Sequence, residues 1–347
     1  TVRMLAEILR ASGLRVASVG NVGDPVVEAV LHPRPHDVLA LELSSFQLHW
    51  TSSVAARAAA VLNVAPDHVD WHGSVAEYAR DKGRIYSGCE VACVYNVADP
   101  VTEELVRAAD VAEGCRAVGF TLGVPEVGMV GVVDGTLVDR AFVDGRHPPD
   151  NLAAELGAVS DVVPAAPHNV ANALAAAALA RSLGVPAVAV RDGLRAFVPD
   201  AHRIATVGTV RGVAWVDDSK ATNPHAAAAS LAAYDDVVWV AGGLAKGATF
   251  DDLVRGARDR LRGVVLLGAD RALVAEALAR HAPEVPVVEV ADTDTGAMDL
   301  VVREAAGLAR PGWTVLLAPA CASMDMFSSY AARGDAFAAA VDRLAAG

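Results

Sequence analysis

Apolar positions in the first half of the chain follow two periodicities in turn. Residues 2–9 carry apolar side chains at spacings of three and four, and Gly13 follows them, which predicts an opening helix closed by a glycine. Short apolar runs come next, at residues 14–20, 37–44, 58–65, 91–99 and 117–123. Helical stretches such as 75–86 separate most of these runs. The alternation predicts a parallel sheet covered by helices on both faces.

The pattern changes after residue 126. Residues 127–143 hold short β-type runs broken by Asp-Gly pairs, which predict hairpins. The stretch 146–167 is Pro-rich and irregular, and we interpret it as a loop insertion without an assigned role. The stretches 168–184 and 186–197 then predict two helices.

A second alternation of strands and helices begins near residue 200. Its apolar runs cover residues 213–219, 237–243, 264–270, 285–292 and 314–320, and a final helix is expected from Met326 to Ala345. The helix-breaking segment 198–201 marks the boundary. We therefore expect an α/β protein of two doubly wound domains, residues 1–199 and 200–347.

Composition narrows the possible partners. The formal net charge of −13 argues against general binding to nucleic acid or to a bilayer surface. The apolar runs are too short for a membrane span, and no signal peptide is visible, so we expect a cytoplasmic protein. The spacing of Cys89, Cys93, Cys115 and Cys321 favours reduced packing cysteines over a metal or disulfide role.

Polar residues follow the first-half strands at the ends where open α/β sheets bind ligands. Glu42 ends one run, just before Ser44 and Gln47. It is a possible Mg²⁺ ligand, although a solvated strand end with a helix cap explains it equally well. His68 follows the next run within the segment PDHVDWH, which fits a metal or phosphate site or a simple polar turn. Lys82, on the helix after it, reads by itself as a solvated lysine.

Strand ends in the second half carry lysines and hydroxyls. Lys220 and Thr222 lie in DDSKATN, Lys246 in a Gly-rich loop, and Ser323 in APACASMDMF. A helix N-terminus with a lysine and hydroxyls attracts anions. We expect a site between the two domains, with an acidic side for metal and phosphate and a basic side for a carboxylate.

Taken together, these segments resemble the Mur ligase family, and most of all its D-glutamate-adding branch. The matching motifs occur in family order over nearly the whole chain: GNVGDP, LELSSFQL, LNVAPDHVDWHGSVAEYARDKGRIY, HNVANALAAAALA, DAHRI, DDSKATN, GGLAKGATF and APACASMDMF. The resemblance implies a mostly parallel central ATPase domain and a Rossmann-like C-terminal domain that binds the amino acid. It also implies an ATP- and Mg²⁺-dependent reaction in which the alanyl carboxylate of UDP-N-acetylmuramoyl-L-alanine becomes an acyl phosphate and D-glutamate attacks it.

The resemblance further implies a role for individual residues. Glu42, His68 and a carbamylated Lys82 match the catalytic and metal-binding positions. The nucleotide-sugar side matches Asn21, Ser44 and Gln47. The ATP side matches Asn169, Asn172, Arg203 and Asp218. The D-glutamate pocket matches Lys220, Thr222, Lys246, Ser323 and Phe327. We expect a monomer that acts on small molecules in peptidoglycan synthesis.

Departures from the family leave alternatives open. No Gly-Lys-Ser/Thr phosphate-binding motif occurs in the sequence, and the opening helix matches the one that follows this motif in the family. We therefore expect a truncated ligase that lacks the UDP-binding domain and is impaired on its own. The alternatives are a related ligase for another amino acid, such as a folylpolyglutamate-type enzyme, or a non-catalytic binding module. Ala205 stands where the family often has an acidic residue.

Overall fold

The computed structural model describes residues 1–143, 153–291 and 296–347. It divides into two compact units, Thr1–Val198 and Pro199–Gly347. Each unit is a mixed α/β structure, as the alternation of strands and helices predicts. The assignment of the first unit to ATP and the second to an amino acid stays a prediction.

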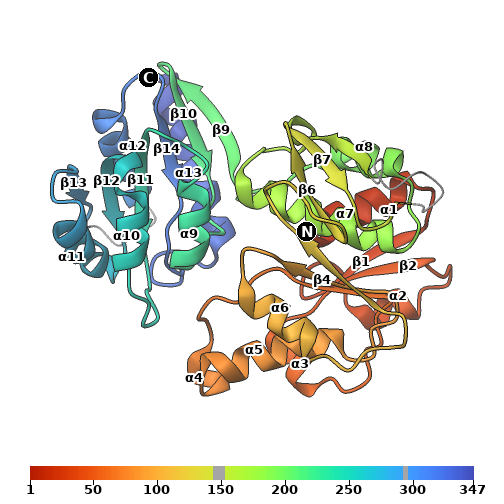
Figure 1. Ribbon diagram of the computed structural model, residues 1–347. Helices are drawn as coiled ribbons and strands as arrows, with labels where there is room; N and C mark the ends of the chain where they lie inside the picture. Colours follow the sequence, from red (N-terminus) through yellow and green to blue (C-terminus); the bar gives the residue numbers. More distant parts are fainter. Residues whose placement is uncertain (144–152, 292–295) are drawn as a thin grey trace. The chain divides into compact units, whose positions relative to one another are not determined.

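The first unit contains two sheets (Figure 1). In the smaller one, β1 (Val16–Gly20) pairs in parallel with β2 (Val38–Glu42). The larger one has the order β3-β4-β5-β6-β7-β8 over the described residues. Its pairs are parallel from β3 to β6 and antiparallel from β6 to β8. These strands are β3 (Ala58–Val61), β4 (Ala92–Asn96), β5 (Arg116–Phe120), β6 (Met129–Val133), β7 (Thr136–Asp139) and β8 (Ala154–Ala158).

An alanine-rich helix lies at the centre of this unit. Helix α7 (Pro167–Ser182) is buried along residues 173–180, because its small side chains let it pack closely against the larger sheet. It packs against β3 to β6 and against the opening helix α1. The helices of the unit are α1 (Val2–Ala11), α2 (Val26–Val30), α3 (Ser45–Trp50), α4 (Val69–His72), α5 (Val75–Gly83), α6 (Pro100–Arg107), α7 and α8 (Ala187–Ala196).

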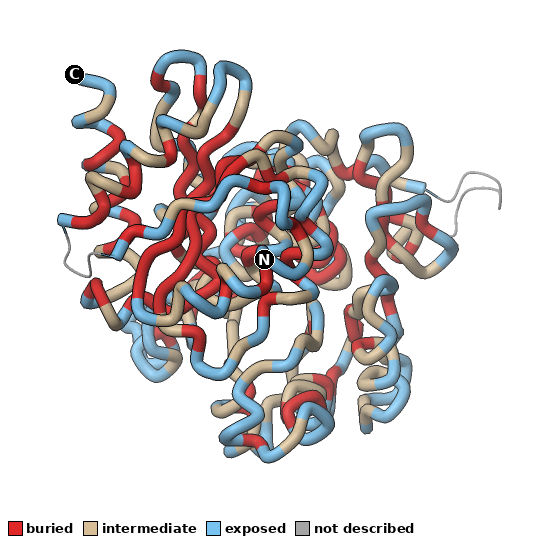
Figure 2. The backbone as a smooth tube through the Cα atoms, turned by 90° about the vertical axis from the view of Figure 1, so that its left-hand side faces the viewer, coloured by how far each residue is buried: buried red, intermediate tan, exposed pale blue. Residues whose placement is uncertain are grey.

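The second unit is built on one sheet with the order β13-β12-β11-β14-β10-β9. All of its pairs are parallel except the edge pair β9–β10. The central strands are buried throughout, as the continuous red segments of Figure 2 show. The strands are β9 (Ala205–Val210), β10 (Val213–Asp217), β11 (Val237–Gly242), β12 (Leu261–Leu267), β13 (Val287–Glu289) and β14 (Thr314–Leu317). The helices are α9 (Pro224–Leu231), α10 (Asp251–Ala257), α11 (Arg271–His281), α12 (Ala297–Leu308) and α13 (Tyr330–Ala346).

Several sequence predictions are confirmed and others need correction. The β6–β7 hairpin turns at an Asp-Gly pair, as expected. The expected loop 146–167 is wrong in its second half, which forms β8 and a 3-10 turn, while 144–152 lie outside the described residues. The final helix begins at Tyr330 rather than Met326, because the Ser329 side chain caps it there. Strand β9 was not expected.

Among the described residues, no helix is both long enough and apolar enough to span a membrane.

Candidate functional site

Glu42 and Asn21 meet where the small sheet ends. Parallel pairing sets Gly20 opposite Glu42, and the Asn21 backbone N–H donates to the Glu42 carbonyl at 2.7 Å. The Asn21 side-chain amide also donates to the Glu42 carboxylate at 3.1 Å. Gly20 permits this approach, because its φ is +108° and a Cβ there would lie 2.2 Å from the Glu42 carbonyl oxygen. The structure thus brings together one residue expected at the metal and one expected at the nucleotide sugar.

Ser44 and Gln47 form a capping box at the start of α3. The Ser44 hydroxyl accepts from the Gln47 backbone N–H at 3.2 Å, and the Gln47 side-chain oxygen accepts from the Ser44 N–H at 2.8 Å. This pair therefore has a structural role in holding the helix directly after β2. A contact of the two residues with a nucleotide sugar stays a prediction.

Lys82 lies on α5, and its environment is unlike that of a solvated lysine. Burial lowers the pKa of Lys82, while the negative charges of Asp67 and Glu42 act in the opposite direction. The Lys82 ammonium lies 5.1 Å from the centre of the Tyr78 ring. Asp67 lies one residue before His68 in the segment PDHVDWH, which the sequence pattern offers as a metal or phosphate site or as a polar turn. The negative charges of Glu42 and Asp67 therefore act on the Lys82 ammonium.

His68 directly precedes α4 as its N-cap residue and has a left-handed conformation with φ 52°. Its ring meets the Phe46 ring edge to face at 4.8 Å between centroids, and its side chain is 48% exposed. The Asp67 carboxylate accepts from the His68 backbone N–H at 2.9 Å. A half-exposed imidazole fixed in this way is accessible to a ligand.

A buried polar network that sequence reasoning missed lies directly beside Lys82. One carboxylate oxygen of Asp81 lies 2.9 Å from the Nδ1 atoms of both His49 and His72. Since a carboxylate only accepts, both Nδ1 atoms carry the proton. The Nε2 atom of His72 lies within hydrogen-bond distance of the Ser45 hydroxyl, at 3.0 Å. The network links α3, α4 and α5.

Hydrogen bonds keep the Asp81 carboxylate of this network ionised. Burial of Asp81 opposes ionisation, but the hydrogen bonds from His49 and His72 outweigh it and lower the pKa of Asp81. Arg84 adds an ion pair at 3.2 Å. The sequence offered two signals for this network: His72 ends the segment PDHVDWH, and Asp81 is an acidic residue beside Lys82.

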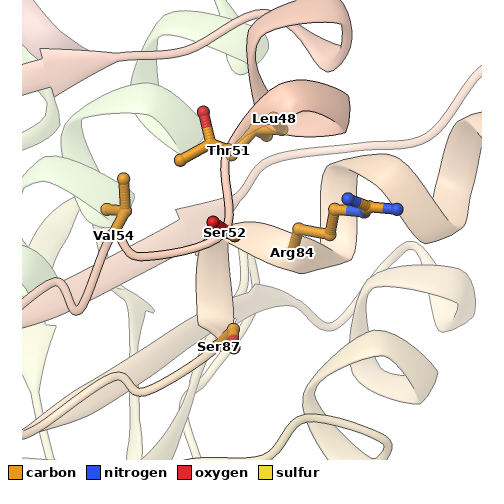
Figure 3. Close-up of a pocket in the computed structure, with 6 residues that line it drawn as sticks. All are labelled: Leu48, Thr51, Ser52, Val54, Arg84 and Ser87. Carbon is orange, nitrogen blue, oxygen red and sulfur yellow. The ribbon is translucent and has the colours of Figure 1, made fainter.

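A small cavity of about 190 Å³ lies next to this network (Figure 3). The Arg84 guanidinium at its edge donates to the His49 carbonyl at 2.8 Å. The lining residues are Leu48, Thr51, Ser52, Val54, Arg84 and Ser87. No residue expected at the site from the sequence lines this cavity, and we assign no ligand to it.

The residues expected to bind ATP are divided between the two units. Asn169 and Asn172 lie in the first turns of α7, where the Asn169 amide donates to the Pro164 carbonyl at 3.2 Å. The Thr1 hydroxyl donates to the Asn172 side-chain oxygen. Arg203 and Asp218 belong to the second unit, and the Arg203 guanidinium lies 3.6 Å from the Asp200 carboxylate.

Asp218 follows β10 and is buried. Burial raises the pKa of Asp218 to about 6, although hydrogen bonds from the Ser230 hydroxyl and the Ile204 N–H act in the opposite direction. A carboxyl group that titrates near neutrality can exchange a proton or bind a cation when a ligand approaches.

Backbone hydrogen bonds join the three loops expected to bind D-glutamate. Leu244 and Ala322 exchange two hydrogen bonds of 2.9 Å, and the Ala320 N–H donates to the Ala221 carbonyl at 2.9 Å. These bonds connect three segments. The first carries Lys220 and Thr222, the second carries Lys246, and the third carries Ser323. The neighbouring order β11-β14-β10 explains the result, because the loops leave adjacent parallel strands at the same edge.

The side chains of this loop cluster have different environments. Lys246 is exposed and has a φ of 50°, whereas the Lys220 ammonium lies 4.1 Å from the centre of the Tyr330 ring. Ser323 is buried. Phe327 packs in the hydrophobic core of the unit, which accounts for its apolar character without a ligand.

Comparisons with known families agree with this division into two units. The Mur ligase middle domain matches residues 1–180, and the Mur ligase glutamate ligase domain matches residues 202–321. The chain belongs to the Mur ligase family, and its D-glutamate ligase relatives act in peptidoglycan synthesis.

Individual relatives define the branch. The UDP-N-acetylmuramoylalanine--D-glutamate ligase of Streptomyces coelicolor is 69% identical over 100% of this chain and 73% of its own length. The enzyme of the same name from Streptomyces avermitilis is 68% identical over the same shares. The fold is similar to that of the UDP-N-acetylmuramoylalanyl-D-glutamyl-2,6-diaminopimelate--D-alanyl-D-alanyl ligase of Acinetobacter baumannii, with a TM-score of 0.66 and 18% identity over 99% of this chain and 74% of that one.

Proposed function

We propose that this chain is built for ATP-dependent addition of D-glutamate to UDP-N-acetylmuramoyl-L-alanine in cytoplasmic peptidoglycan precursor synthesis, as a monomer whose turnover on its own is weak. The names of its relatives support the substrates. The residues expected from the family motifs support the chemistry, because they gather at strand ends within each unit.

The use of lysine is the observation that carries the proposal. Of 29 basic side chains only Lys82, Lys220 and Lys246 are lysines, and all three fall at expected site positions. Arginine supplies the rest of the positive charge. Arginine cannot lose its proton in a protein, whereas a buried lysine can become a neutral nucleophile. At position 82 a lysine therefore supplies an amine that an arginine could not.

Lys82 is the residue we propose to be carbamylated. Its neutral amine attacks CO₂, a nitrogen–carbon bond forms, and one proton leaves, so that a cation becomes an anion. The burial that lowers its pKa favours the neutral amine. The resulting carbamate, the Glu42 carboxylate and the His68 imidazole form a donor set in which the oxygens suit Mg²⁺. When bound, Mg²⁺ neutralises phosphate charge during phosphoryl transfer.

The proposed reaction has two covalent steps. The γ-phosphoryl group of ATP passes to the alanyl carboxylate, which gives an acyl phosphate and ADP. The amine of D-glutamate then attacks the acyl carbon, and the tetrahedral intermediate loses phosphate and a proton to leave an amide. Lys220, Lys246 and the hydroxyls of the loop cluster would orient the carboxylates of D-glutamate.

Carbon-13 NMR tests the role of Lys82. In ¹³C-bicarbonate the purified chain should show a slowly exchanging carbamate resonance that depends on Mg²⁺. Lys82→Arg should lose the resonance while keeping the positive charge, and Lys246→Ala, the matched lysine control, should keep it. A resonance that survives Lys82→Arg refutes the carbamate assignment.

Calorimetry with D-glutamate tests the loop cluster. Lys246→Ala should weaken binding of D-glutamate, and Lys82→Arg should leave it unchanged. Binding assays suit this chain because its sequence holds no Gly-Lys-Ser/Thr motif, and we expect weak ATP turnover from the 347 residues alone. Preference for another amino acid would indicate a related ligase, and strong Mg²⁺-dependent ATP turnover would contradict the expected impairment.

A further inference from the structure

Three cysteine thiols meet at the start of β4 and β5, and none of them is used in the proposed reaction. Cys89 precedes β4, Cys93 lies within it, and Cys115 immediately precedes β5. The pairing of Cys93 with Ala117 explains the convergence. Cys115 lies two residues before Ala117, so its side chain is on the same face of the sheet as that of Cys93. The three sulfur atoms all lie within 4.8 Å of one another.

The separation of the thiols fits a shared ion better than a disulfide. The Cys93 and Cys115 sulfurs are 3.8 Å apart, far beyond the S–S bond length of about 2.05 Å. Sulfurs placed about 2.3 Å from a common ion lie about 4 Å apart in a trigonal arrangement. Within the described residues, this is the one group of three potential ligands from His, Cys, Asp and Glu.

Backbone carbonyls lie around the Cys89 sulfur. The Cys89 thiol donates to the Ala92 carbonyl at 3.2 Å and lies 3.9 Å from the Arg57 carbonyl oxygen. A thiol that donates a hydrogen bond carries its proton, so a cation that binds the sulfur must displace that proton.

From this arrangement we propose that Cys89, Cys93 and Cys115 form a three-sulfur site for a soft monovalent cation, Cu(I). Thiolates select soft ions, hard cations such as Mg²⁺ require oxygen ligands, and Zn²⁺ generally takes four ligands. The surroundings of the thiols are apolar, with Ala59, Val61 and Tyr86 in the same cluster. Binding replaces thiol protons by Cu(I) without any change of oxidation state, so protons are released. Cys115 is partly exposed and provides the access.

Competition with a Cu(I) chelator tests this site under reducing, oxygen-free conditions. The reduced chain should take one Cu(I) from bicinchoninate and release protons as it does so. Cys115→Ser, the least buried position, should lower the affinity by at least about 100-fold. Cys321→Ser is the matched control, because Cys321 is a free cysteine of the second unit, and it should bind like the unaltered chain.

Two further measurements keep the result decisive. The Tm of each metal-free variant shows whether it is folded, and Cys93→Ala replaces Cys115→Ser if the latter does not fold. Failure of the unaltered chain to compete with bicinchoninate overturns the proposal. A folded Cys115 or Cys93 variant that binds Cu(I) as tightly as the unaltered chain overturns it as well, because the copper would then lie elsewhere.

Discussion

Replacing Asp81 with alanine removes the acceptor on which two imidazole N–H groups converge. The His72 side chain is 0% exposed, so its N–H would be left without water or a partner. A hydrogen bond to a charged group contributes about 1.5–3 kcal/mol, and an unpaired buried donor costs about 1–3 kcal/mol. The His49 side chain is 36% exposed, so water compensates for much of its bond. We expect Asp81→Ala to lower the free energy of unfolding by about 3–4 kcal/mol.

Asp81→Asn is the matched control, because it keeps an oxygen acceptor of the same size and removes only the charge. Its expected loss is about 1–2 kcal/mol, since hydrogen bonds to charged groups exceed neutral ones by roughly that amount. Urea unfolding gives the totals, and hydrogen exchange of residues 45–86 reports on the first unit alone. Equal losses in the two variants, or a loss below about 1 kcal/mol in Asp81→Ala, would refute this reasoning.

The same network has a defined pH dependence. The pKa of Asp81 is lowered in the folded chain, so its stabilisation is complete above the ordinary carboxyl pKa of about 3.9. Stabilisation is then lost as the pH falls through the lowered folded value. The difference in unfolding free energy between the unaltered chain and Asp81→Ala should therefore shrink in acid. A constant difference down to the acid-unfolding region would show that the carboxylate charge is not its cause.

Two further predictions concern packing and burial. Gly193→Ala should destabilise the first unit by about 3 kcal/mol or more, because the new Cβ would lie 2.4 Å from the Ile8 Cα; Gly307→Ala, with nothing within 4 Å, should be neutral or stabilising by thermal unfolding. Burial raises the pKa of Asp218 to about 6, so this group lowers stability by roughly 2–3 kcal/mol as the pH rises from about 4 to about 6. Asp218→Asn should remove that loss, and an unchanged pH profile of urea unfolding would contradict it.

The fold was predictable wherever local pattern and tertiary burial agree. A continuous apolar run predicts β11, and an Asp-Gly pair predicts the turn of the β6–β7 hairpin. Each of these signals lies within a few neighbouring residues. Strand β9 carries no such signal, because it is a half-exposed edge strand with mixed polar and apolar residues. Strand β8 was hidden by Pro-rich flanks, although its pairing with β7 supplies the hydrogen bonds that define it.

The sequence predicted the candidate residues at each strand end, but it did not predict which strand ends lie side by side. The contact of Asn21 with Glu42 depends on the register of β1 with β2, which joins positions 21 residues apart. His49 and Asp81 are 32 residues apart in the sequence. No sequence pattern indicates that a histidine and an aspartate so far apart are in contact. The thiol cluster likewise needs β5 beside β4 to bring Cys115 to Cys93. Sequence reasoning therefore recovers residue types at strand ends and misses partners that only the sheet order brings together.

The buried network also connects residues that the proposed reaction uses separately. Ser45 lies beside Ser44 on α3, His72 ends the helix that His68 directly precedes, and Asp81 precedes Lys82 on α5. Breaking the link at Asp81 therefore frees α5 relative to the helices that carry the other expected ligands. Under the proposed function, Asp81→Ala should reduce the Mg²⁺-dependent carbamate resonance of Lys82, even when the variant is fully folded in the absence of urea. Asp81→Asn should keep most of this resonance. If both folded variants retained the full resonance, the packing of α5 alone would position Lys82. The proposed link between Asp81 and Lys82 would then be wrong.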